Sequence, residues 1–426
     1  MKNDFKIETA LVQSLEDYTQ GEPRVYPIVQ STTYNFKDPD VVADLFDLKI
    51  VGDMYSRISN PTVSAFENKM AALEGGVGAV AVSSGQAATT MAILNICNTG
   101  DNIVATSTLY GGTHTLLSST LAKIGITTTF VDPEAPIEEL DKAINEKTRA
   151  VFAETIGNPG MNVLDIEKFA EFAHKNNIPL IIDNTIATPF LCRPFDFGAD
   201  IIVHSATKYI DGQATCVGGV VVDSGNFDWE KGGKFSCLTE PDPDYHGLSY
   251  TKTFGKAAYI TKARANILRD YGSTMSAFNA FIYLRGLETL HLRMERHSEN
   301  ALKVAKFLEN HEKITWVNYS VLESDKYHAL QQKYLPKGAS GMILFGIKGG
   351  AEAGRVFTKN LQWINNVVHL GDVRTCLLHP ASTTHRQLSE EQQIAAGVLP
   401  EAIRLNVGIE SIDDIIKDID NALKNI

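Results

Sequence analysis

A lysine and an aspartate in the middle of the chain have surroundings that suit covalent cofactor chemistry. Asp183 ends a short apolar run, and Lys208 follows a second run after two hydroxyl side chains, Ser205 and Thr207. Pyridoxal phosphate (PLP) needs these groups: an amine to form a Schiff base, hydroxyls near the phosphate, and a carboxylate to keep the ring nitrogen protonated. We therefore predict that PLP is bound through Lys208. Taken singly, Lys208 could be a solvated surface charge and Asp183 could cap the next turn.

A glycine-containing turn provides a candidate phosphate site. The sequence Ser83-Ser84-Gly85-Gln86 follows an apolar run and begins a predicted helix. Free backbone N–H groups at a helix start, approached closely through a glycine, suit an anion such as a phosphate, although an ordinary strand-to-helix turn has the same pattern. The nearby Gly76-Val77-Gly78 precedes a strand, whereas the glycines of a dinucleotide fingerprint follow one. This order argues against NAD binding.

Charge and cysteine content limit the partners and the location. With 39 basic and 51 acidic residues among 426, the formal net charge is −12, so we expect no electrostatic binding to nucleic acid or an anionic membrane. The amino terminus lacks the apolar core of a signal peptide, and no apolar run is long enough to cross a bilayer. The five cysteines are scattered, without a CxxC pair. We expect a cytoplasmic protein with reduced thiols.

The elements that position these residues alternate along the chain. Short apolar runs without polar alternation are separated by helical stretches, which is typical of a mainly parallel sheet covered by helices on both faces. Ligands of such sheets gather at the carboxyl ends of the strands. The runs are Ala79–Val82, Ile103–Ala105, Thr128–Val131, Ala150–Ala153, Leu180–Ile182 and Ile201–Val203.

The pattern predicts three parts. Residues 1–62 are rich in turn formers and are expected to form an arm, residues 63–285 a large PLP-binding domain, and residues 286–426 a smaller α+β domain. Strands of the small domain are expected at Gly341–Phe345 and Ile403–Val407.

Three further segments carry local signals. A helix is expected from an Asn60 cap and Pro61 to Gly75-Gly76. One long amphipathic helix is expected across Leu287–Leu308, where apolar residues recur at spacings of three and four. Residues 223–256, which are rich in proline and aspartate near Glu240, are expected to form a surface excursion.

Several long motifs occur together and in order. They are Tyr55–Thr62, Glu154–Pro159, the Asp183 and Lys208 segments, His379–His385 and Ile403–Glu410. On these motifs the chain resembles the Cys/Met-metabolism family of PLP-dependent enzymes over nearly its whole length. Within that family it looks most like the O-acetylhomoserine sulfhydrylases, or O-acetylhomoserine aminocarboxypropyltransferases. The resemblance implies fold type I of the PLP-dependent transferases: an N-terminal arm, a mainly parallel sheet flanked by helices, and a smaller α+β C-terminal domain.

The resemblance also implies roles for individual residues. Lys208 would form the Schiff base and move protons, Asp183 would pair with the ring nitrogen, and Asn158 would hydrogen-bond the phenolic oxygen. Tyr110 would stack on the ring and assist proton transfer at the leaving group. The phosphate would be bound by Gly85, Gln86, Ser205 and Thr207, with Tyr55 and Arg57 from a neighbouring subunit.

Substrate recognition is implied at Arg404, which would hold the substrate carboxylate bidentately, and at His369 and Tyr55. Relatives commonly have serine or asparagine at the position of His369. Alternatives stay open: Tyr110 could be a core aromatic and Arg57 a surface charge, whereas a buried Arg404 would need a partner.

The two histidines of the His379–His385 motif suggest a metal, but no carboxylate or cysteine lies at the usual ligand spacing. We therefore expect no metal site, and a structural loop role for this motif.

The implied reaction is a γ-replacement. O-acetyl-L-homoserine and sulfide would give L-homocysteine and acetate, and methanethiol would give methionine. Cystathionine γ-synthase and methionine γ-lyase activities are alternatives on the same scaffold, although Gly112, where related γ-lyases often have cysteine, argues against the latter. An inactive scaffold or regulator is an alternative of a different class. The sequence leaves open an acetyl or succinyl donor and free or protein-carried sulfide. Family members imply tetramers built from dimers with shared sites.

Overall fold

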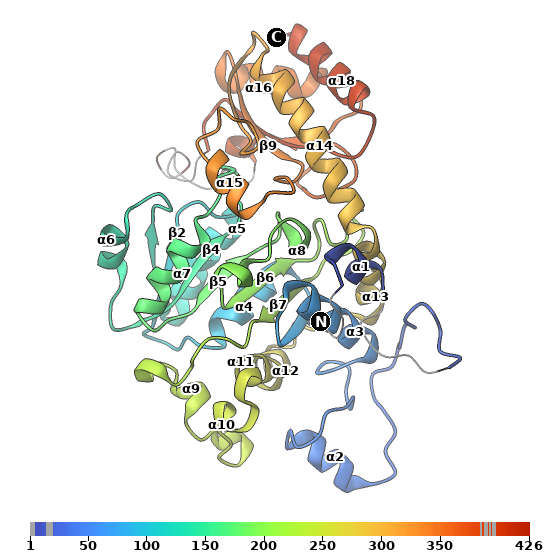
Figure 1. Cartoon of the computed structure of the whole chain (residues 1–426), viewed down its shortest axis with the longest axis vertical. Helices are drawn as coiled ribbons and strands as arrows, with labels where there is room; N and C mark the ends of the chain where they lie inside the picture. Colours follow the sequence, from blue (N-terminus) through green and yellow to red (C-terminus); the bar gives the residue numbers. More distant parts are fainter. Residues whose placement is uncertain (1–4, 14–19, 384–385, 387–390, 392, 394–397) are drawn as a thin grey trace.

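A seven-stranded sheet occupies the first half of the chain. The computed structural model describes residues 5–13, 20–383, 386, 391, 393 and 398–426 (Figure 1). The strand order is β1-β7-β6-β5-β4-β2-β3, and only β7 runs antiparallel to its neighbours. The strands are β1 Gly78–Val82, β2 Asn102–Thr106, β3 Thr127–Val131, β4 Thr148–Glu154, β5 Leu180–Asp183, β6 Ile201–Ser205 and β7 Gly219–Asp223. All six apolar runs predicted as strands lie in this sheet, so the mainly parallel arrangement is confirmed.

Helices flank the sheet and connect its strands. They are α1 Ile7–Val12, α2 Pro39–Phe46, α3 Pro61–Glu74, α4 Gly85–Leu94, α5 Gly111–Thr115, α6 Ile137–Leu140, α7 Ile166–Lys175, α8 Thr188–Leu191, α9 Ser236–Thr239, α10 Tyr250–Phe254, α11 Ala258–Lys262, α12 Arg269–Tyr271, α13 Ala277–Glu288, α14 Leu290–Glu309, α15 His328–Tyr334, α16 Gly350–Asn360 and α18 Ile412–Lys424. The predicted cap of α3 is confirmed, because the Asn60 side chain accepts from the N–H groups of Thr62 and Val63. The helix ends where Gly75 takes a left-handed conformation with φ 84°.

A second, five-stranded sheet lies above the first in Figure 1 and has its own apolar core. Its order is β10-β11-β12-β9-β8, and helices α14, α16 and α18 pack against it or one another. The strands are β8 Ile314–Asn318, β9 Met342–Ile347, β10 Asn365–Asn366, β11 Cys376–Leu378 and β12 Ala402–Asn406. The two strands expected here therefore correspond to β9 and β12.

The prediction of one continuous helix across Leu287–Leu308 is wrong. Helix α13 ends at Glu288 and α14 begins at Leu290, because Thr289 leaves the helical conformation with φ −107° and ψ 5°. The Arg293 side chain donates to the carbonyl oxygen of Gly286 at 2.6 Å and so binds an end of the first helix. The spacing of apolar residues predicts which side chains are buried, but it does not indicate where one helix ends and the next begins.

The segment 223–256 is less exposed than predicted. Trp229, Phe235 and Tyr250 are buried, and the Trp229 ring stacks on Tyr259 with centroids 5.1 Å apart. The turn-forming residues predicted a segment on the surface, but the aromatic side chains between them pack into the core of the large sheet.

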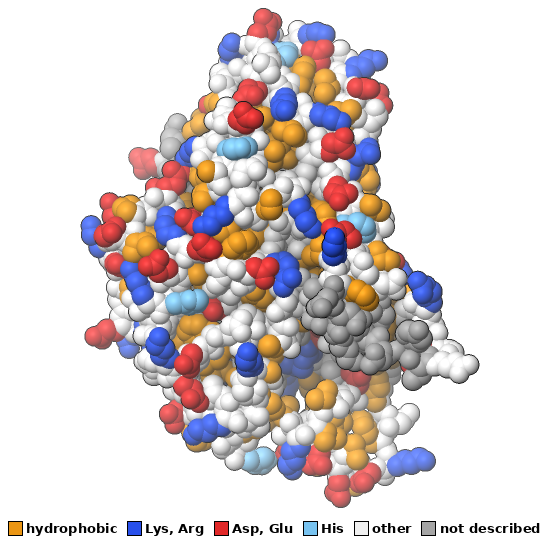
Figure 2. Space-filling view, in the orientation of Figure 1, with side chains coloured by type: hydrophobic (Ala, Val, Ile, Leu, Met, Phe, Trp, Pro, Cys, Tyr) orange, Lys and Arg blue, Asp and Glu red, His pale blue; other side chains and the backbone are white. Residues whose placement is uncertain are grey.

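The arm extends away from both sheets. Between residues 20 and 60 the structure is mostly irregular, and it includes α2, which projects from the body in Figure 1. Phe46, Ile50 and Val51 are exposed there, and apolar side chains are visible over this part of the surface in Figure 2. Among the helices of the described residues, none combines the length and the apolar character needed to cross a membrane.

Candidate active site

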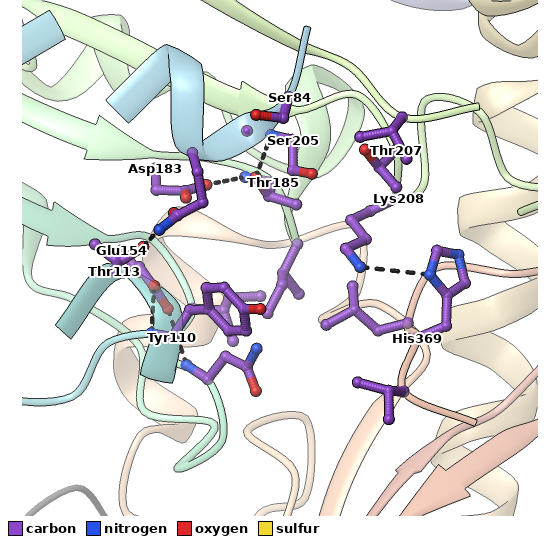
Figure 3. A pocket seen from close by; sticks show the side chains of 18 of the residues that line it. Ser84, Tyr110, Thr113, Glu154, Asp183, Thr185, Ser205, Thr207, Lys208 and His369 are labelled. Atoms are coloured by element: carbon purple, nitrogen blue, oxygen red, sulfur yellow. Dashed lines mark hydrogen bonds between the residues drawn. The ribbon is translucent and has the colours of Figure 1, made fainter. Parts of the chain in front are cut away.

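A cavity of about 230 Å³ opens at the carboxyl ends of β4, β5 and β6. Parallel strands bring their carboxyl ends to one edge, which is where ligands of such sheets bind. Strand ends, the start of α4 and residues near the second sheet all contribute side chains (Figure 3). The lining residues include Ser84, Gly85, Gln86, Tyr110, Thr113, Glu154, Asn158, Asp183, Thr185, Ser205, Thr207, Lys208, His369 and Arg404. Most of the predicted site residues are therefore brought together.

Lys208 points into this cavity with its amine toward His369 (Figure 3). The Nζ atom lies 3.4 Å from Nδ1 of His369. Burial lowers the pKa of Lys208 to about 8, and the positive charge of Arg404 adds to the effect. A lysine in this state is partly neutral near physiological pH, and the neutral amine is the nucleophilic form.

Asp183 is a partly buried carboxylate at the end of β5, and no salt bridge to it is found among the described residues. Its Oδ1 accepts from the backbone N–H of Thr185 at 2.9 Å. Burial raises the pKa of Asp183, and the hydrogen bonds from Thr185 only oppose that rise. A protonated ring nitrogen beside this carboxylate would supply the missing positive charge. The residues present therefore fit the pyridine ring of PLP.

Glu154 is a buried carboxyl at the same edge of the sheet, and we had predicted no role for it from the sequence. Its Oε1 accepts from the backbone N–H of Tyr110 at 2.7 Å and its Oε2 from that of Asn158 at 3.0 Å. Burial raises the pKa of Glu154 strongly, and the nearby charge of Asp183 raises it further. Glu154 ends an apolar strand just as Asp183 does, so the same signal would have found it.

The start of α4 forms a cradle for an anion. The Ser84 side chain caps the helix by accepting from Ala87 N–H at 3.1 Å. A Cβ atom at Gly85 would lie 2.6 Å from the Cβ of Ser205, so only glycine permits this closeness of helix and strand. Thr207, on the same rim, exchanges hydrogen bonds with the backbone of Gly218. Backbone N–H groups and hydroxyls at a helix start suit the phosphate of PLP.

Arg404, on β12, is a buried cation that faces neutral oxygens. Its Nη1 donates to Asn158 Oδ1 at 3.0 Å, and its Nη2 donates to the backbone carbonyl of His369 at 3.0 Å. Burial lowers the pKa of Arg404 to about 10. A substrate carboxylate would supply the counter-ion that this guanidinium lacks in the cavity.

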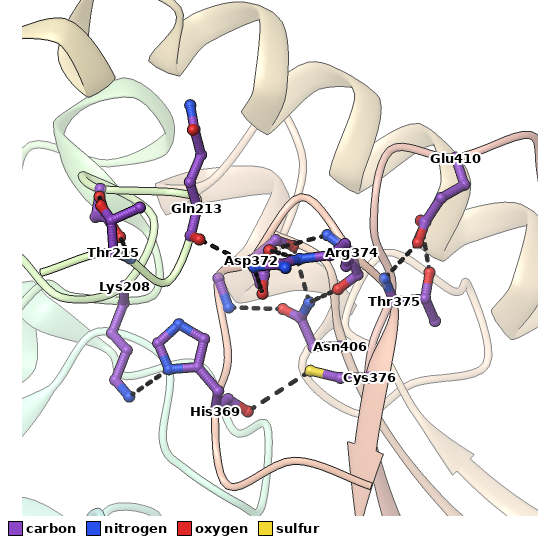
Figure 4. A network of polar contacts seen from close by, with 12 residues as sticks. Lys208, Gln213, Thr215, His369, Asp372, Arg374, Thr375, Cys376, Asn406 and Glu410 are labelled. Carbon is purple, nitrogen blue, oxygen red and sulfur yellow. Dashed lines mark hydrogen bonds and ion pairs between the residues drawn. The ribbon is translucent and has the colours of Figure 1, made fainter. Parts of the chain in front are cut away.

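His369 contributes both its backbone and its ring to the cavity. Burial, followed by the charge of Lys208, lowers the pKa of His369 to about 4, so its imidazole is neutral at physiological pH. We predicted from the sequence that His369 lies near the substrate carboxylate, and its backbone carbonyl accepts from Arg404. The loop is fixed to β12 because Asn406 Oδ1 accepts from Gly371 N–H at 2.8 Å. Asn406 Nδ2 also donates to the backbone carbonyl of Asp372 at 3.2 Å (Figure 4).

Tyr55 and Arg57 do not line the cavity of their own chain. Arg57 instead lies over the Tyr55 ring, 5.3 Å from its centroid, and donates to the backbone carbonyl of Arg269.

In the His379–His385 motif, His379 Nδ1 lies 2.8 Å from Ser382 Oγ, whereas His385 is outside the described residues. Within the part of the chain that the structure describes, no three His, Cys, Asp or Glu side chains are grouped to hold a metal ion.

The family model described as Cys/Met metabolism PLP-dependent enzyme matches residues 8–424. The chain belongs to this family of PLP-dependent enzymes, which confirms the cofactor inferred from Lys208 and Asp183.

Its similarity to particular members is high. It is 49% identical to an O-acetyl-L-homoserine sulfhydrylase of Leptospira meyeri, over 100% of this chain and 98% of that protein. It is 47% identical to a homocysteine synthase of Schizosaccharomyces pombe, over 98% and 99%. A crystal structure of a putative O-acetylhomoserine (thiol)-lyase from Campylobacter jejuni, with N'-pyridoxyl-lysine-5'-monophosphate, has a TM-score of 0.95 and 39% identity, covering 99% of this chain and 100% of that one.

Proposed function

We propose that the protein replaces the acetoxy group of O-acetyl-L-homoserine with sulfide, giving L-homocysteine and acetate. One observation carries the proposal: a desolvated Lys208 lies in a single cavity with the partly buried Asp183 and the buried Arg404. The similarity to proteins named as O-acetylhomoserine sulfhydrylases supports the choice of substrate.

When bound, PLP supplies an electron sink that makes the carbon beside the substrate's amino group acidic. Asp183 would hold the proton on the ring nitrogen, and the α4 start with Gln86, Ser205 and Thr207 would bind the phosphate. Asn158, whose Oδ1 accepts from Arg404, would turn its amide N–H toward the phenolic oxygen.

Lys208 and Arg404 divide the work on the amino acid. Arg404 holds the carboxylate and so fixes the position of the α-carbon relative to Lys208. The neutral amine of Lys208 removes the α-proton and later returns a proton to the product. Acetate leaves the γ-carbon once a proton has also been removed from the β-carbon, and sulfide then adds to the γ-carbon as the β- and α-carbons regain their protons. Tyr110, whose backbone N–H donates to Glu154, assists at the leaving group.

The proposed unit is a homo-oligomer, a tetramer built from dimers, in which Tyr55 and Arg57 complete a neighbour's phosphate and substrate site. The support is that these side chains lie outside the cavity of their own chain.

We also propose the division into arm, large domain and small domain at residues 62 and 285, the second of which falls within α13. A cytoplasmic location is supported by five cysteines that form no disulfide.

Gly112 favours γ-replacement over a methionine γ-lyase reaction. A Cβ atom at this position would lie 2.6 Å from Cε1 of Tyr110. A cysteine at residue 112 would therefore force the Tyr110 ring out of its present place.

Product analysis with competing nucleophiles tests the activity. The purified PLP-loaded protein is incubated with O-acetylhomoserine and either sulfide, methanethiol or cysteine, then with methionine alone, and then with O-succinylhomoserine and sulfide. Homocysteine and acetate in equal amounts are expected with sulfide. Faster formation of cystathionine from cysteine would indicate cystathionine γ-synthase, and 2-oxobutyrate from methionine would indicate a γ-lyase. No turnover in any reaction would favour the scaffold alternative.

A further inference from the structure

Polar side chains at or one residue beyond the ends of three strands lie on the face of the sheet opposite to the cavity. Successive side chains of a strand point to opposite faces. The residue next to each cavity residue therefore faces away from the ligand. These back-face residues are Thr155 after Glu154, Asn184 after Asp183, and His204 before Ser205, and all three are buried.

Glu74, the last residue of α3, joins these back-face side chains. Its Oε1 accepts from Asn184 Nδ2 at 3.0 Å and lies 2.6 Å from His204 Nε2. Asn184 Oδ1 in turn accepts from Thr155 Oγ1 at 2.8 Å. Glu74 and His204 are both fully buried, so water does not compete for these hydrogen bonds. One carboxyl group thus ties together the ends of β4, β5 and β6.

The strand ends are also linked through their backbones. Thr155 N–H donates to the carbonyl of Asp183 at 3.1 Å, and Asn184 N–H donates to the carbonyl of Val203 at 3.0 Å. A shift of the Asn184 side chain therefore moves the peptide that carries Asp183. Burial raises the pKa of Asp183, and the hydrogen bonds from Thr185 oppose that rise, so the carboxyl depends on the groups that hold it in place.

We propose that Glu74 and His204 are positioning residues that act through Asn184 to hold Asp183 in the orientation that keeps the PLP ring nitrogen protonated. The proposal rests on PLP binding and on the proposed role of Asp183. It is independent of which nucleophile the enzyme uses.

Glu67 provides a matched control on the same helix. It is also a buried carboxyl, but its Oε2 lies 2.6 Å from Arg264 and its Oε1 accepts from Ala81 N–H at 2.7 Å. Its contacts therefore lead to β1 and not to the strand ends at the cavity. Glu67→Gln should show how far a change at a buried carboxyl of α3 alters PLP binding and the melting temperature. It leaves intact the back-face cluster, which consists of Glu74, Thr155, Asn184 and His204.

The test compares Glu74→Ala, Glu74→Gln and Glu67→Gln in the full-length protein loaded with ring-¹⁵N-labelled PLP. The readouts are the ¹⁵N chemical shift of the ring nitrogen, the dissociation constant for PLP and the melting temperature. For Glu74→Ala we expect a shift toward the deprotonated ring and a roughly tenfold weaker PLP affinity, as for other groups that orient a ligand-binding side chain. Glu74→Gln keeps an acceptor for Asn184 and should restore most of both.

A double variant separates this role from general stabilisation. If Glu74 acts through Asp183, Glu74→Ala should weaken PLP binding little further in an Asp183→Asn background, because the two losses are not additive. Should Glu74→Ala not fold, Thr155→Val, which removes one hydroxyl from the cluster, must still move the ring ¹⁵N shift in the same direction. Additive losses, or an unchanged ¹⁵N shift in the folded back-face variants, would overturn the proposal. Failure of the γ-replacement assay would leave these cofactor measurements interpretable.

Discussion

The Nζ atom of Lys208 lies 3.4 Å from Nδ1 of His369, in a cavity where burial lowers the pKa of both side chains. The lysine, with a pKa of about 8, is the group that changes charge near physiological pH. His369, with a pKa of about 4, stays neutral and accepts from the amine. The fraction of Lys208 in its neutral, reactive form therefore depends on pH near 8, and the neutral His369 ring does not add a charge to the cavity.

The rate of PLP binding should reveal the lowered pKa of Lys208. Only the neutral amine attacks the aldehyde. Burial moves the pKa downward, so the neutral form accumulates as the pH rises through about 8. Stopped-flow appearance of the visible absorbance in PLP-free protein should therefore rise with a midpoint near pH 8. The rate at which PLP reacts with a small lysine amide in solution, measured at the same pH values, corrects for the ionisation of PLP itself. A midpoint above pH 10 would show that Lys208 is not desolvated.

Arg404→Ala should impair substrate binding and leave the cofactor in place. Loss of charged hydrogen bonds to the substrate carboxylate corresponds to a rise in KM of about 10- to 100-fold. Arg404→Lys should restore little, because an ammonium group cannot make the bidentate contact. Steady-state kinetics and the visible spectrum measure the two effects separately. Normal kinetics in Arg404→Ala would remove this residue from the site.

Mixing two inactive variants tests the shared site. Arg57→Ala should damage the site that its arm completes, and Lys208→Ala should inactivate its own cavity. After joint refolding, a mixed dimer would keep one intact site, so random pairing should restore about a quarter of wild-type activity. Each variant refolded alone is the control. Absence of recovery despite demonstrated mixed dimers, or a fully active monomer, would contradict a site shared between subunits.

Gly112→Ala should lower turnover by displacing Tyr110. The added Cβ would lie 2.6 Å from the Tyr110 ring, and misplacement of a reacting group by about 1 Å can cost on the order of 100-fold in rate. Gly354→Ala is a suitable control, since its Cβ would make only ordinary contacts at 3.4 Å or more. Equal kcat values for both variants would show that the Tyr110 position is unimportant for the reaction.

The sequence was most informative where a chemical signal coincided with a local structural one. Asp183 lies at the end of a predicted strand and Gly85 at the start of a predicted helix. The continuous apolar runs predicted six of the seven strands of the large sheet, and β7 was not predicted. Glu154 has the same strand-end signal, but its hydrogen bonds go to the backbone N–H groups of Tyr110 and Asn158, which only the folded chain brings to it. The break at Thr289 had no such signal.

Contacts between distant segments could not be derived from local patterns. Arg404 and Asn158 are 246 residues apart, and Glu74 and His204 are 130 apart. Only the folded sheet brings these pairs together. The buried partner that Arg404 was expected to need proved to be a set of neutral oxygens.

Borohydride reduction of the PLP-loaded enzyme, followed by peptide mass mapping, tests the central claim most directly. Lys69 is the matched internal control: burial lowers its pKa to about 8 as well, but it lies outside the cavity. We predict that the pyridoxyl group is found on Lys208 alone and that Lys208→Ala abolishes both the label and homocysteine formation. A label on Lys69 or another lysine, or sulfide-dependent turnover in Lys208→Ala, would contradict the account.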